Sequence, residues 1–337
     1  MRDGPFAPAR NIIRATQRIM DSRRLRDSGN RDGCIAAPEA RKAAPGCDSM
    51  NPDSPSDIRL LLEEQGLALK KRWGQNFLVN RGARGRLLDI LDPGAGELVW
   101  EIGPGLGSMT ELLMGRSRRL IAFEIDRGLC RYLTKELPGI GGFVLVPGDF
   151  KDTWRNALEE WGPPQAILGN LPYRSASLMI GALVESGMRP RAMVFTVQKE
   201  LAERMTAVPA TKSYSSFSVL CQASFHTIPR GDLRPGSFYP APDIISSIIE
   251  MRPRQDAPDG PVQEMLSCLT RAFFASRRKT LRNNALAGRF PPPVSPADAL
   301  KALEAEGIEV SGRAEELPPE AFVGIARRLC STLPSSP

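Results

Sequence analysis

The segment from Val99 to Thr110 restricts the possible folds of this chain more than any other stretch. It begins within an apolar run, Leu98–Ile102, that has the length of a buried strand. Three glycines follow at alternate positions before helical spacing starts: Gly103, Gly105 and Gly107. Glycine permits backbone angles and close ligand approaches that a Cβ would block. A strand, a glycine turn and a helix N-terminus in this order predict a ligand site on the backbone, although the same string also occurs in ordinary tight turns.

Three later apolar runs also end in polar or turn residues, which favours the ligand site over the ordinary turn. The runs are Leu120–Phe123, followed by Glu124; Phe143–Val146, followed by Gly148 and Asp149; and Ala166–Leu168, followed by Gly169 and Asn170. The carboxyl ends of parallel strands meet at one edge of a sheet, and ligands bind there. An acid at the end of the second strand is placed to bind ribose hydroxyls. Glu124 or Asp149 alone would be read as a solvated strand end, whereas the series predicts one shared site.

The string Asn170-Leu-Pro-Tyr173 separates the chemistries that such a sheet can support. Hydride transfer has no use for it, and it resembles the fourth motif of S-adenosylmethionine-dependent adenine-N6 methyltransferases. From about Lys70 to about Leu286 the chain is similar, more narrowly, to the ribosomal RNA adenine dimethyltransferases. Six segments carry this resemblance, in the family's order: Lys71–Leu78, Glu101–Gly107, Gly169–Tyr173, Gln198–Arg204, Phe238–Pro242 and Arg277–Asn284.

The resemblance implies an α/β fold with a Rossmann-like methyltransferase sheet, helices on both of its faces, and a small all-α C-terminal domain. The expected boundaries are 1–49 for an N-terminal extension, 50–258 for the methyltransferase domain with its N-terminal lid, and 259–337 for a helical domain that contacts RNA. The implied activity is S-adenosylmethionine-dependent dimethylation of N6 on two adjacent adenines near the 3′ end of small-subunit (16S) rRNA, linked to 30S subunit biogenesis. The implied partner is small-subunit rRNA or a 30S precursor.

The family's functional residues carry over to the matching positions of this chain. The resemblance implies cofactor contacts from Asn76, Leu78, Gly103, Gly105, Gly107, Glu124, Asp149 and Asn170. Within that set, the glycine turn would lie against the methionine half of the cofactor, Glu124 against its ribose, and Asp149 against its adenine amino group. The catalytic residues implied in the same way are Asn170, Leu171, Pro172, Tyr173 and Phe238.

The Asn170–Tyr173 string suits methyl transfer to an exocyclic amine. Adenine N6 is a poor nucleophile because its lone pair is delocalised into the ring. Two acceptors for its hydrogens would aim that lone pair at the methyl group, namely the side-chain oxygen of Asn170 and a backbone carbonyl at Leu171 or Pro172. Tyr173 offers an aromatic face to a base that has left its stack. The resemblance adds Phe238 as a second stacking surface.

Basic residues gather at two places that could contact RNA phosphate. Lys71 and Arg72 begin the first of the six segments, and a denser group lies in the C-terminal part: Arg271, Arg277, Arg278, Lys279, Arg282 and Arg289. From these we expect RNA contacts at Lys71, Arg72, Arg277, Arg278, Lys279 and Arg282. Helical spacing would put Arg278 and Arg282 on one face. A basic helix face is often merely solvated, and only its place beside a base-modifying site favours RNA.

Periodicity predicts alternating strands and helices followed by a helical end. Helices are expected after Ser54, which can cap a helix, and over 84–91, 108–114, 126–137, 151–160, 175–186, 199–205, 262–274, 279–287, 296–306 and 319–329. Beyond the four strands above, further strands are expected over 191–197, 223–228 and 244–251. Residues 212–216 read as a polar loop, 74–78 as a turn, and Phe238–Pro242 as irregular because of its prolines.

Composition bounds the class of protein. A formal net charge of +7 and a pI near 9.3 favour a polyanionic partner. The six cysteines show no CxxC spacing and His226 is the only histidine, so we expect no metal, no disulfide framework and no Ser-His-Asp triad. The cysteine pattern also fits reduced thiols in a cytosol, so we expect a cytoplasmic protein. No run of eighteen apolar residues exists, so no membrane partner is expected. We also expect a monomer.

The first 49 residues allow several interpretations. They combine low hydrophobicity with high charge, which predicts disorder. An arginine-rich start is typical of an organelle transit peptide, but Asp3, Asp21, Asp27 and Asp32 speak against one. Met50 stands where related enzymes usually begin, so an over-extended translation start is also open.

Three other functions compete with small-subunit rRNA dimethylation. A large-subunit rRNA adenine methyltransferase of the antibiotic-resistance type would usually carry Asn-Ile-Pro-Tyr and would lack the Arg277–Asn284 string. A mitochondrial transcription factor on the same fold would be a nucleic-acid-binding protein rather than an enzyme, and an acid-poor transit peptide would support it. A generic NAD-binding enzyme would leave the Asn170–Tyr173 string unexplained.

Overall fold

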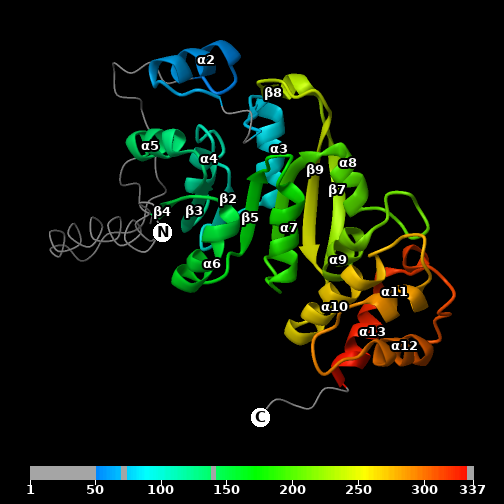
Figure 1. The fold of residues 1–337 in the computed structure, drawn as a ribbon. Helices are drawn as coiled ribbons and strands as arrows, with labels where there is room; N and C mark the ends of the chain where they lie inside the picture. The colour runs from blue at the N-terminus through cyan, green and yellow to red at the C-terminus, as the bar shows by residue number, and fades with distance from the viewer. Residues whose placement is uncertain (1–50, 70–73, 138–141, 332–337) are drawn as a thin grey trace, which may run out of the picture.

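The computed structural model describes residues 51–69, 74–137 and 142–331. In this part of the chain the main sheet has seven strands in the order β4-β3-β2-β5-β6-β9-β7 (Figure 1). The parallel strands are β2 (Leu98–Ile102), β3 (Arg119–Glu124), β4 (Phe143–Pro147), β5 (Ala166–Asn170) and β6 (Ala192–Gln198). The antiparallel strands are β9 (Ser246–Pro253) and β7 (Phe225–Leu233), which complete one side of the sheet.

Helices cover both faces of this sheet, as predicted. One face packs against α3 (Arg81–Leu91), α4 (Thr110–Met114) and α5 (Arg127–Glu136), and the other against α6 (Phe150–Trp161) and α7 (Ala176–Glu185). The alternation is visible within β3, where Leu120 and Ala122 belong to the first core and Ile121 and Phe123 to the second. Buried parallel strands read as continuous apolar runs for this reason.

The acids that follow the strands also begin the next helices. Asp126 accepts the backbone N–H groups of Gly128 and Leu129 at the start of α5, and Asp149 accepts that of Lys151 at the start of α6. Each side chain satisfies amides that have no partner inside the helix. Because β2 to β6 are parallel, the strand ends predicted at Glu124, Asp149 and Asn170 lie at the same, carboxyl edge of the sheet.

The C-terminal helices pack against the side of the sheet that carries α7. They are α10 (Gly260–Phe273), α11 (Leu281–Ala287), α12 (Pro296–Ala305) and α13 (Pro319–Ser331), with a short 3-10 turn, η3 (Ala314–Glu316). Their apolar side chains join the same core as α6, α7 and α9 (Ser216–Ser224). The Arg189 guanidinium also joins the two parts, donating to the Pro258 carbonyl at 2.8 Å and to Gln263 Oε1 at 2.9 Å. The domain boundary near residue 259 stays a prediction.

Helix α9 and strand β7 correct the predicted order in this region. We expected a strand over 223–228, but Ala223 and Ser224 end α9, and β7 runs from Phe225 to Leu233. Ser215 and Ser218 form a capping box at the start of α9. This helix therefore begins at the end of the segment 212–216, which was predicted as a polar loop. Short polar residues mark helix starts as well as loops, which explains the error.

Two short segments also differ from the prediction. Phe238–Tyr239 forms the strand β8, which pairs antiparallel with β1 (Phe77–Leu78), so neither segment is purely irregular. Proline follows these two residues, and their own N–H groups stay available for the ladder. The helix expected over 279–287 starts only at Leu281, because Thr280 is its N-cap and accepts the Asn283 N–H.

The remaining elements agree with the prediction in type. They are α2 (Pro55–Glu64), which Ser54 caps, and α8 (Lys199–Met205). A 3-10 turn that was not predicted, η2 (Pro235–Ser237), precedes β8. No helix among the described residues has the length and apolar character to cross a membrane.

Candidate active site

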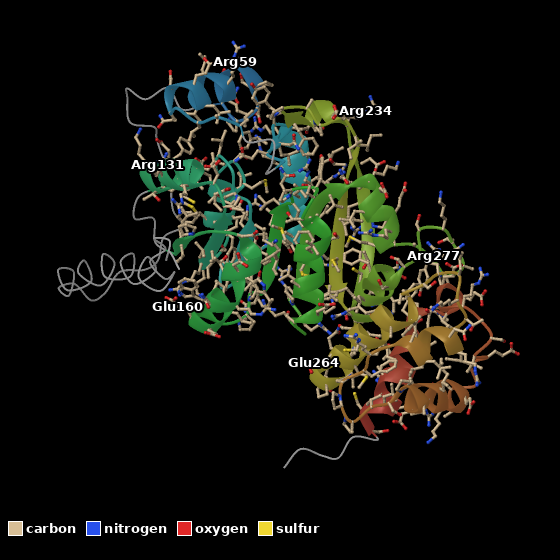
Figure 2. The ribbon with its side chains drawn as sticks, viewed as in Figure 1. Arg59, Arg131, Glu160, Arg234, Glu264 and Arg277 are labelled. Carbon is tan, nitrogen blue, oxygen red and sulfur yellow. The ribbon has the colours of Figure 1, made fainter. Side chains whose placement is uncertain are left out.

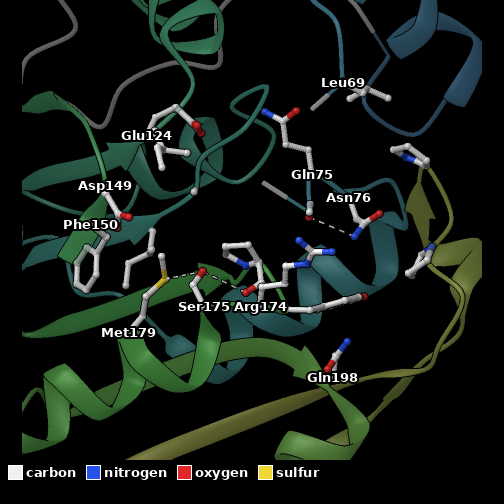
Figure 3. A pocket seen from close by; sticks show the side chains of 18 of the residues that line it. Leu69, Gln75, Asn76, Glu124, Asp149, Phe150, Arg174, Ser175, Met179 and Gln198 are labelled. Atoms are coloured by element: carbon white, nitrogen blue, oxygen red, sulfur yellow. Dashed lines mark hydrogen bonds between the residues drawn. The ribbon is translucent and has the colours of Figure 1, made fainter. Parts of the chain in front are cut away.

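A cavity of about 750 Å³ opens at the carboxyl ends of β3, β4 and β5 (Figure 3). Six of the predicted site residues line it: Asn76, Gly103, Glu124, Asp149, Pro172 and Tyr173. A smaller cleft of about 40 Å³ adjoins it, and its lining includes Leu78, Gly103, Gly105 and Asn170. Gly103 belongs to both linings, so the glycine turn separates the two spaces. Gly107 lines neither.

The glycine turn has the backbone conformation that its sequence suggested. Gly103 and Gly105 have φ angles of 74° and 60°, in the left-handed region that favours glycine. A Cβ at Gly105 would lie 3.0 Å from the ring of Phe77, which packs over the turn. The turn is therefore close-packed under β1 and keeps its amides near the end of β3.

Glu124 is fixed by that turn. It is 4% exposed, its Oε2 accepts the Gly105 N–H at 3.2 Å, and its Oε1 accepts the Asp126 N–H at 2.8 Å. Burial raises the pKa of this carboxyl to about 7, and the two backbone donors oppose that shift. A carboxylate oxygen has more than one acceptor position, so each retains capacity for a ligand hydroxyl.

A second buried acid, Glu101, was absent from the predicted site. It lies inside β2, lines the smaller cleft, and its Oε2 accepts the Thr110 hydroxyl hydrogen at 2.7 Å. Burial raises the pKa of Glu101 to about 8. A charged residue within the apolar run Leu98–Ile102 was the available signal, because an acid is seldom fully buried unless it has a partner.

Asp149 combines a structural contact with a place at the cavity. Its Oδ1 accepts the Lys151 N–H at 3.0 Å, and its Oδ2 lies 3.4 Å from Lys151 Nζ. The same carboxylate reaches the cavity beside Phe150 (Figure 3).

Asn170 is held from both sides at the end of β5. Its Nδ2 donates to the Asn76 carbonyl at 2.7 Å, and its Oδ1 accepts the hydroxyl hydrogen of Thr196. Thr196, 1% exposed, is its register partner on β6. Sequence reasoning missed Thr196, whose only signal is a hydroxyl inside an apolar strand. The amide plane of Asn170 is therefore fixed while its oxygen keeps a second lone pair.

The two candidate backbone acceptors after Asn170 differ. The Pro172 carbonyl already accepts the N–H groups of Ser175 and Ala176, both at 3.0 Å, at the start of α7. Among the described residues, none donates a hydrogen bond to the Leu171 carbonyl. The structure thus leaves Leu171 as the carbonyl with acceptor capacity.

The aromatic residues fall in different places. Tyr173 lines the cavity, and its hydroxyl lies 2.6 Å from Ser246 Oγ on β9, which fixes the ring. Burial raises its pKa above the ordinary value of 10. Phe238 instead is 3% exposed, pairs with Leu78 across the β1–β8 ladder, and does not line the cavity. In this conformation it offers no free face, so its stacking role stays a prediction that requires β8 to move.

The residues predicted to contact RNA also lie in different elements. Arg277, Arg278, Lys279 and Arg282 are exposed, but the first three lie in the turn before α11 and only Arg282 is helical. The shared helix face expected for Arg278 and Arg282 is therefore wrong. Lys71 and Arg72 lie outside the described residues.

Comparison with known proteins agrees with the sequence motifs. A family model described as ribosomal RNA adenine dimethylase matches residues 66–329. The ribosomal RNA small subunit methyltransferase A of Treponema pallidum is 39% identical over 284 residues, which cover 84% of this chain and 99% of that protein.

Two solved structures share the fold. A dimethyladenosine transferase from Plasmodium falciparum has a TM-score of 0.60 and 22% identity, over 75% of this chain and 96% of that one. The 23S rRNA methyltransferase ErmE has a TM-score of 0.55 and 23% identity, over 76% of this chain and 100% of that one. The described part of the chain thus has the fold of an S-adenosylmethionine-dependent methyltransferase, and the family match over residues 66–329 makes the chain a member of the ribosomal RNA adenine dimethylase family.

Proposed function

We propose that this chain is an S-adenosylmethionine-dependent enzyme that dimethylates N6 of two adjacent adenines near the 3′ end of 16S rRNA. It would act on a 30S precursor, in the cytoplasm and as a monomer. The observation that carries this proposal is the position of Asn170: its fixed amide lies at the end of β5 and lines the smaller cleft, which shares Gly103 with the cavity. Membership of the adenine dimethylase family supports the choice of base.

The residues of the site fit S-adenosylmethionine. A cavity of about 750 Å³ is within the usual range for small-molecule sites, roughly 300–1,000 Å³. Glu124 at the end of β3 would accept ribose hydroxyls, Asp149 would accept the adenine amino group, and the glycine turn would lie against the methionine half. When bound, the cofactor supplies a methyl group on a sulfonium, which is an excellent leaving group.

Alignment then accounts for most of what the protein must contribute. Asn170 Oδ1 and the Leu171 carbonyl would accept the two N6 hydrogens and aim the nitrogen lone pair. Tyr173 would stack on a base that has left its helix. Asn170 is neutral, so the proton of the product amine would leave to solvent.

The large-subunit alternative rests on a shared fold only. The ErmE likeness, at 23% identity, concerns architecture and does not choose a substrate. The Asn170–Tyr173 string, the Arg277–Asn284 string and the 39% identity to a ribosomal RNA small subunit methyltransferase A favour the small subunit.

Mass spectrometry of rRNA tests this proposal. Small-subunit rRNA from cells lacking this chain should lose two dimethyladenines near its 3′ end, and the wild-type gene should restore them. An Asn170→Ala gene should not restore them, although its protein should still bind the RNA, because that contact matters at the reacting nitrogen. Loss of a large-subunit methylation instead would establish the alternative.

Calorimetry tests the cofactor assignment separately. Glu124→Ala should weaken S-adenosylmethionine binding by roughly 1.5–3 kcal/mol, the range for a hydrogen bond to a charged group. Unchanged affinity would remove Glu124 from the cofactor site.

A further inference from the structure

Arg277, one of the residues expected to contact RNA, already has protein partners. Its Nε donates to Glu315 Oε2 at 2.6 Å, and its Nη1 donates to the Lys212 carbonyl at 2.7 Å. Its Nη2 lies 2.5 Å from the same Glu315 oxygen and 3.4 Å from the Thr211 carbonyl. A guanidinium offers a fixed fork of donors, and here all three of its nitrogens face the protein. Arg277 therefore ties η3 and the turn before α11 to the α8–α9 loop, residues 206–215.

That loop has a conformation that needs support. Ala210 has a φ of 64°, in the left-handed region that residues with a Cβ seldom adopt. Its N–H donates to the Glu315 main-chain carbonyl at 2.7 Å. The main-chain carbonyl of Glu315 thus holds the loop at Ala210. The side chain of Glu315 pairs with Arg277, and Arg277 in turn holds the loop at Thr211 and Lys212. Such conformations persist when their surroundings fix them.

The supported loop presents a cation beside two others. The side chains of Lys212, Arg278 and Lys279 are exposed, and none of them forms an ion pair within the described part of the chain. Arg282 and Arg289 are also exposed without an ion pair in the described part of the chain, whereas Arg271 pairs with Glu185 at 3.0 Å and Arg328 with Glu306 at 2.8 Å. Figure 2 shows Arg277 at the edge of the C-terminal helices that faces this loop.

The loop is also linked to the cavity by one short helix. Gln198 lines the cavity, and α8 runs from Lys199 to Met205, immediately before the loop. Seven residues at 1.5 Å each span about 10 Å. A nucleic acid with one base at the cavity could therefore reach the loop with neighbouring phosphates.

We propose that Arg277 and Glu315 form a clip that holds the α8–α9 loop, so that Lys212, Arg278 and Lys279 make one surface for RNA phosphate. This rests on the proposed rRNA substrate. Arg277 and Glu315 are positioning residues in this arrangement, and Glu315 assists RNA binding although it is acidic.

The sign of the Glu315→Ala effect distinguishes the clip from simple charge. Removing an acid from a phosphate-binding surface should tighten RNA binding if only Coulomb attraction matters. If Glu315 holds the clip, Glu315→Ala should weaken binding several-fold. Glu316→Ala is the matched control, since it removes the same charge from the next residue, which contacts the Arg313 N–H and not Arg277. It should leave RNA affinity unchanged or slightly improve it.

A double-variant comparison then tests the role of the loop. Binding of 30S subunits from cells lacking this chain would be measured against salt concentration. Lys212→Ala should weaken binding and reduce the slope of log K against log salt by about 0.7–0.9, the value for one phosphate contact. In a Glu315→Ala background the same substitution should have a smaller effect, because Arg277 has lost the carboxylate that holds it against the Thr211 and Lys212 carbonyls. Lys279→Ala should weaken RNA binding by the same factor in the wild type and in the Glu315→Ala variant.

Two results would overturn the clip. In the first, Glu315→Ala binds RNA as tightly as the wild type or more tightly. In the second, Lys212→Ala weakens RNA binding by the same factor with and without Glu315→Ala. If Glu315→Ala does not fold, Arg277→Met opens the clip from its other partner and should reduce the Lys212→Ala effect in the same way. Methylation of the 30S subunits by the wild type is measured in parallel. If it is absent, the proposed function fails, whereas a failed clip leaves that methylation intact.

Discussion

At the scale of single residues, the polar groups of the site are held by partners that are distant in sequence. Asn170 lies between the Asn76 carbonyl, 94 positions away, and the Thr196 hydroxyl, 26 positions away. Both contacts orient the side-chain oxygen proposed to accept an N6 hydrogen. Asn170 is thus oriented before any base arrives, and a preorganised dipole costs little reorganisation during reaction.

Thr196→Val should lower kcat without changing the affinity for S-adenosylmethionine. The valine fills the same volume in β6 but donates no hydrogen bond to Asn170 Oδ1, and a hydrogen bond contributes about 0.5–1.5 kcal/mol, roughly 2- to 10-fold in rate. Single-turnover methylation at saturating RNA measures this. Thr196→Ser should restore the rate, and a full rate in the valine variant would exclude the orienting role.

Glu101 should make the stability of the ligand-free protein depend on pH. Its pKa is about 8 in the folded state, against an ordinary value of 4.5, so between these values the folded state retains a proton that the unfolded chain releases. The free energy of unfolding should therefore fall as pH rises from 4.5 to 8, by up to about 1.4 kcal/mol per pH unit.

Glu101→Gln removes this titration and keeps an acceptor for the Thr110 hydroxyl. The variant should become more stable relative to the wild type as pH rises, as measured by denaturant unfolding at pH 5, 6.5 and 8. Glu124 is present in both proteins, so the difference between them reports Glu101 together with its charge interaction with Glu124. Parallel pH profiles would contradict the assignment.

At the scale of elements, one buried arginine joins three segments around the glycine turn. Arg84 on α3 is 5% exposed, donates to the carbonyls of Pro52 at 3.2 Å and Leu78 at 3.0 Å, and pairs with Asp53. It therefore connects the segment before α2 with β1, whose Phe77 covers Gly105. The lid over the smaller cleft, formed by Phe77 and Leu78 of β1, is thus anchored to α3 through Arg84.

Arg84→Met should loosen this lid. The methionine keeps the apolar stem but leaves the carbonyls and Asp53 without their donor, so the free energy of unfolding should fall by about 1–3 kcal/mol. Affinity for S-adenosylmethionine, measured by calorimetry, should fall as well because Phe77 and Leu78 line the cleft. Arg81→Met, at an exposed position of the same helix, is the control. Equal effects of the two substitutions would refute the anchoring role.

At the scale of the whole molecule, the sheet and the C-terminal helices share a core. The cluster that contains Trp100 and Phe195 from the sheet continues through α9 to Phe273 and Phe322. The other face forms a second cluster, to which Ile58 and Leu62 of α2 contribute. The helical end and the sheet are thus packed as neighbours, and the N-terminal helix belongs to the folded body.

A chain that begins at Met50 should unfold at the same temperature as the full chain and methylate RNA equally well. The first 49 residues are too poor in apolar side chains to build a core, and 84% of this chain covers 99% of the Treponema relative. A chain that begins at Leu67 should be less stable, because it lacks Asp53, Ile58 and Leu62. Thermal unfolding compares the three, and a loss of stability in the Met50 chain would show a structural role for the extension.

The sequence alone determined the parallel sheet, the glycine turn and the carboxyl edge as the place of the site. Each is a local property: a buried strand is an apolar run, and the residue that ends it is adjacent in the chain. The Asn170–Tyr173 string and five further segments also identified the family, because each motif is contiguous.

Tertiary structure alone decided how these residues are used. It engaged the Pro172 carbonyl at the start of α7, paired Asn170 with Thr196, buried Phe238 and directed Arg277 to Glu315. Periodicity could not predict these outcomes, because each depends on which distant group competes for the same donor, acceptor or space. A hydrogen bond between residues 94 positions apart leaves no local pattern, since its energy depends on where the chain brings the two atoms together.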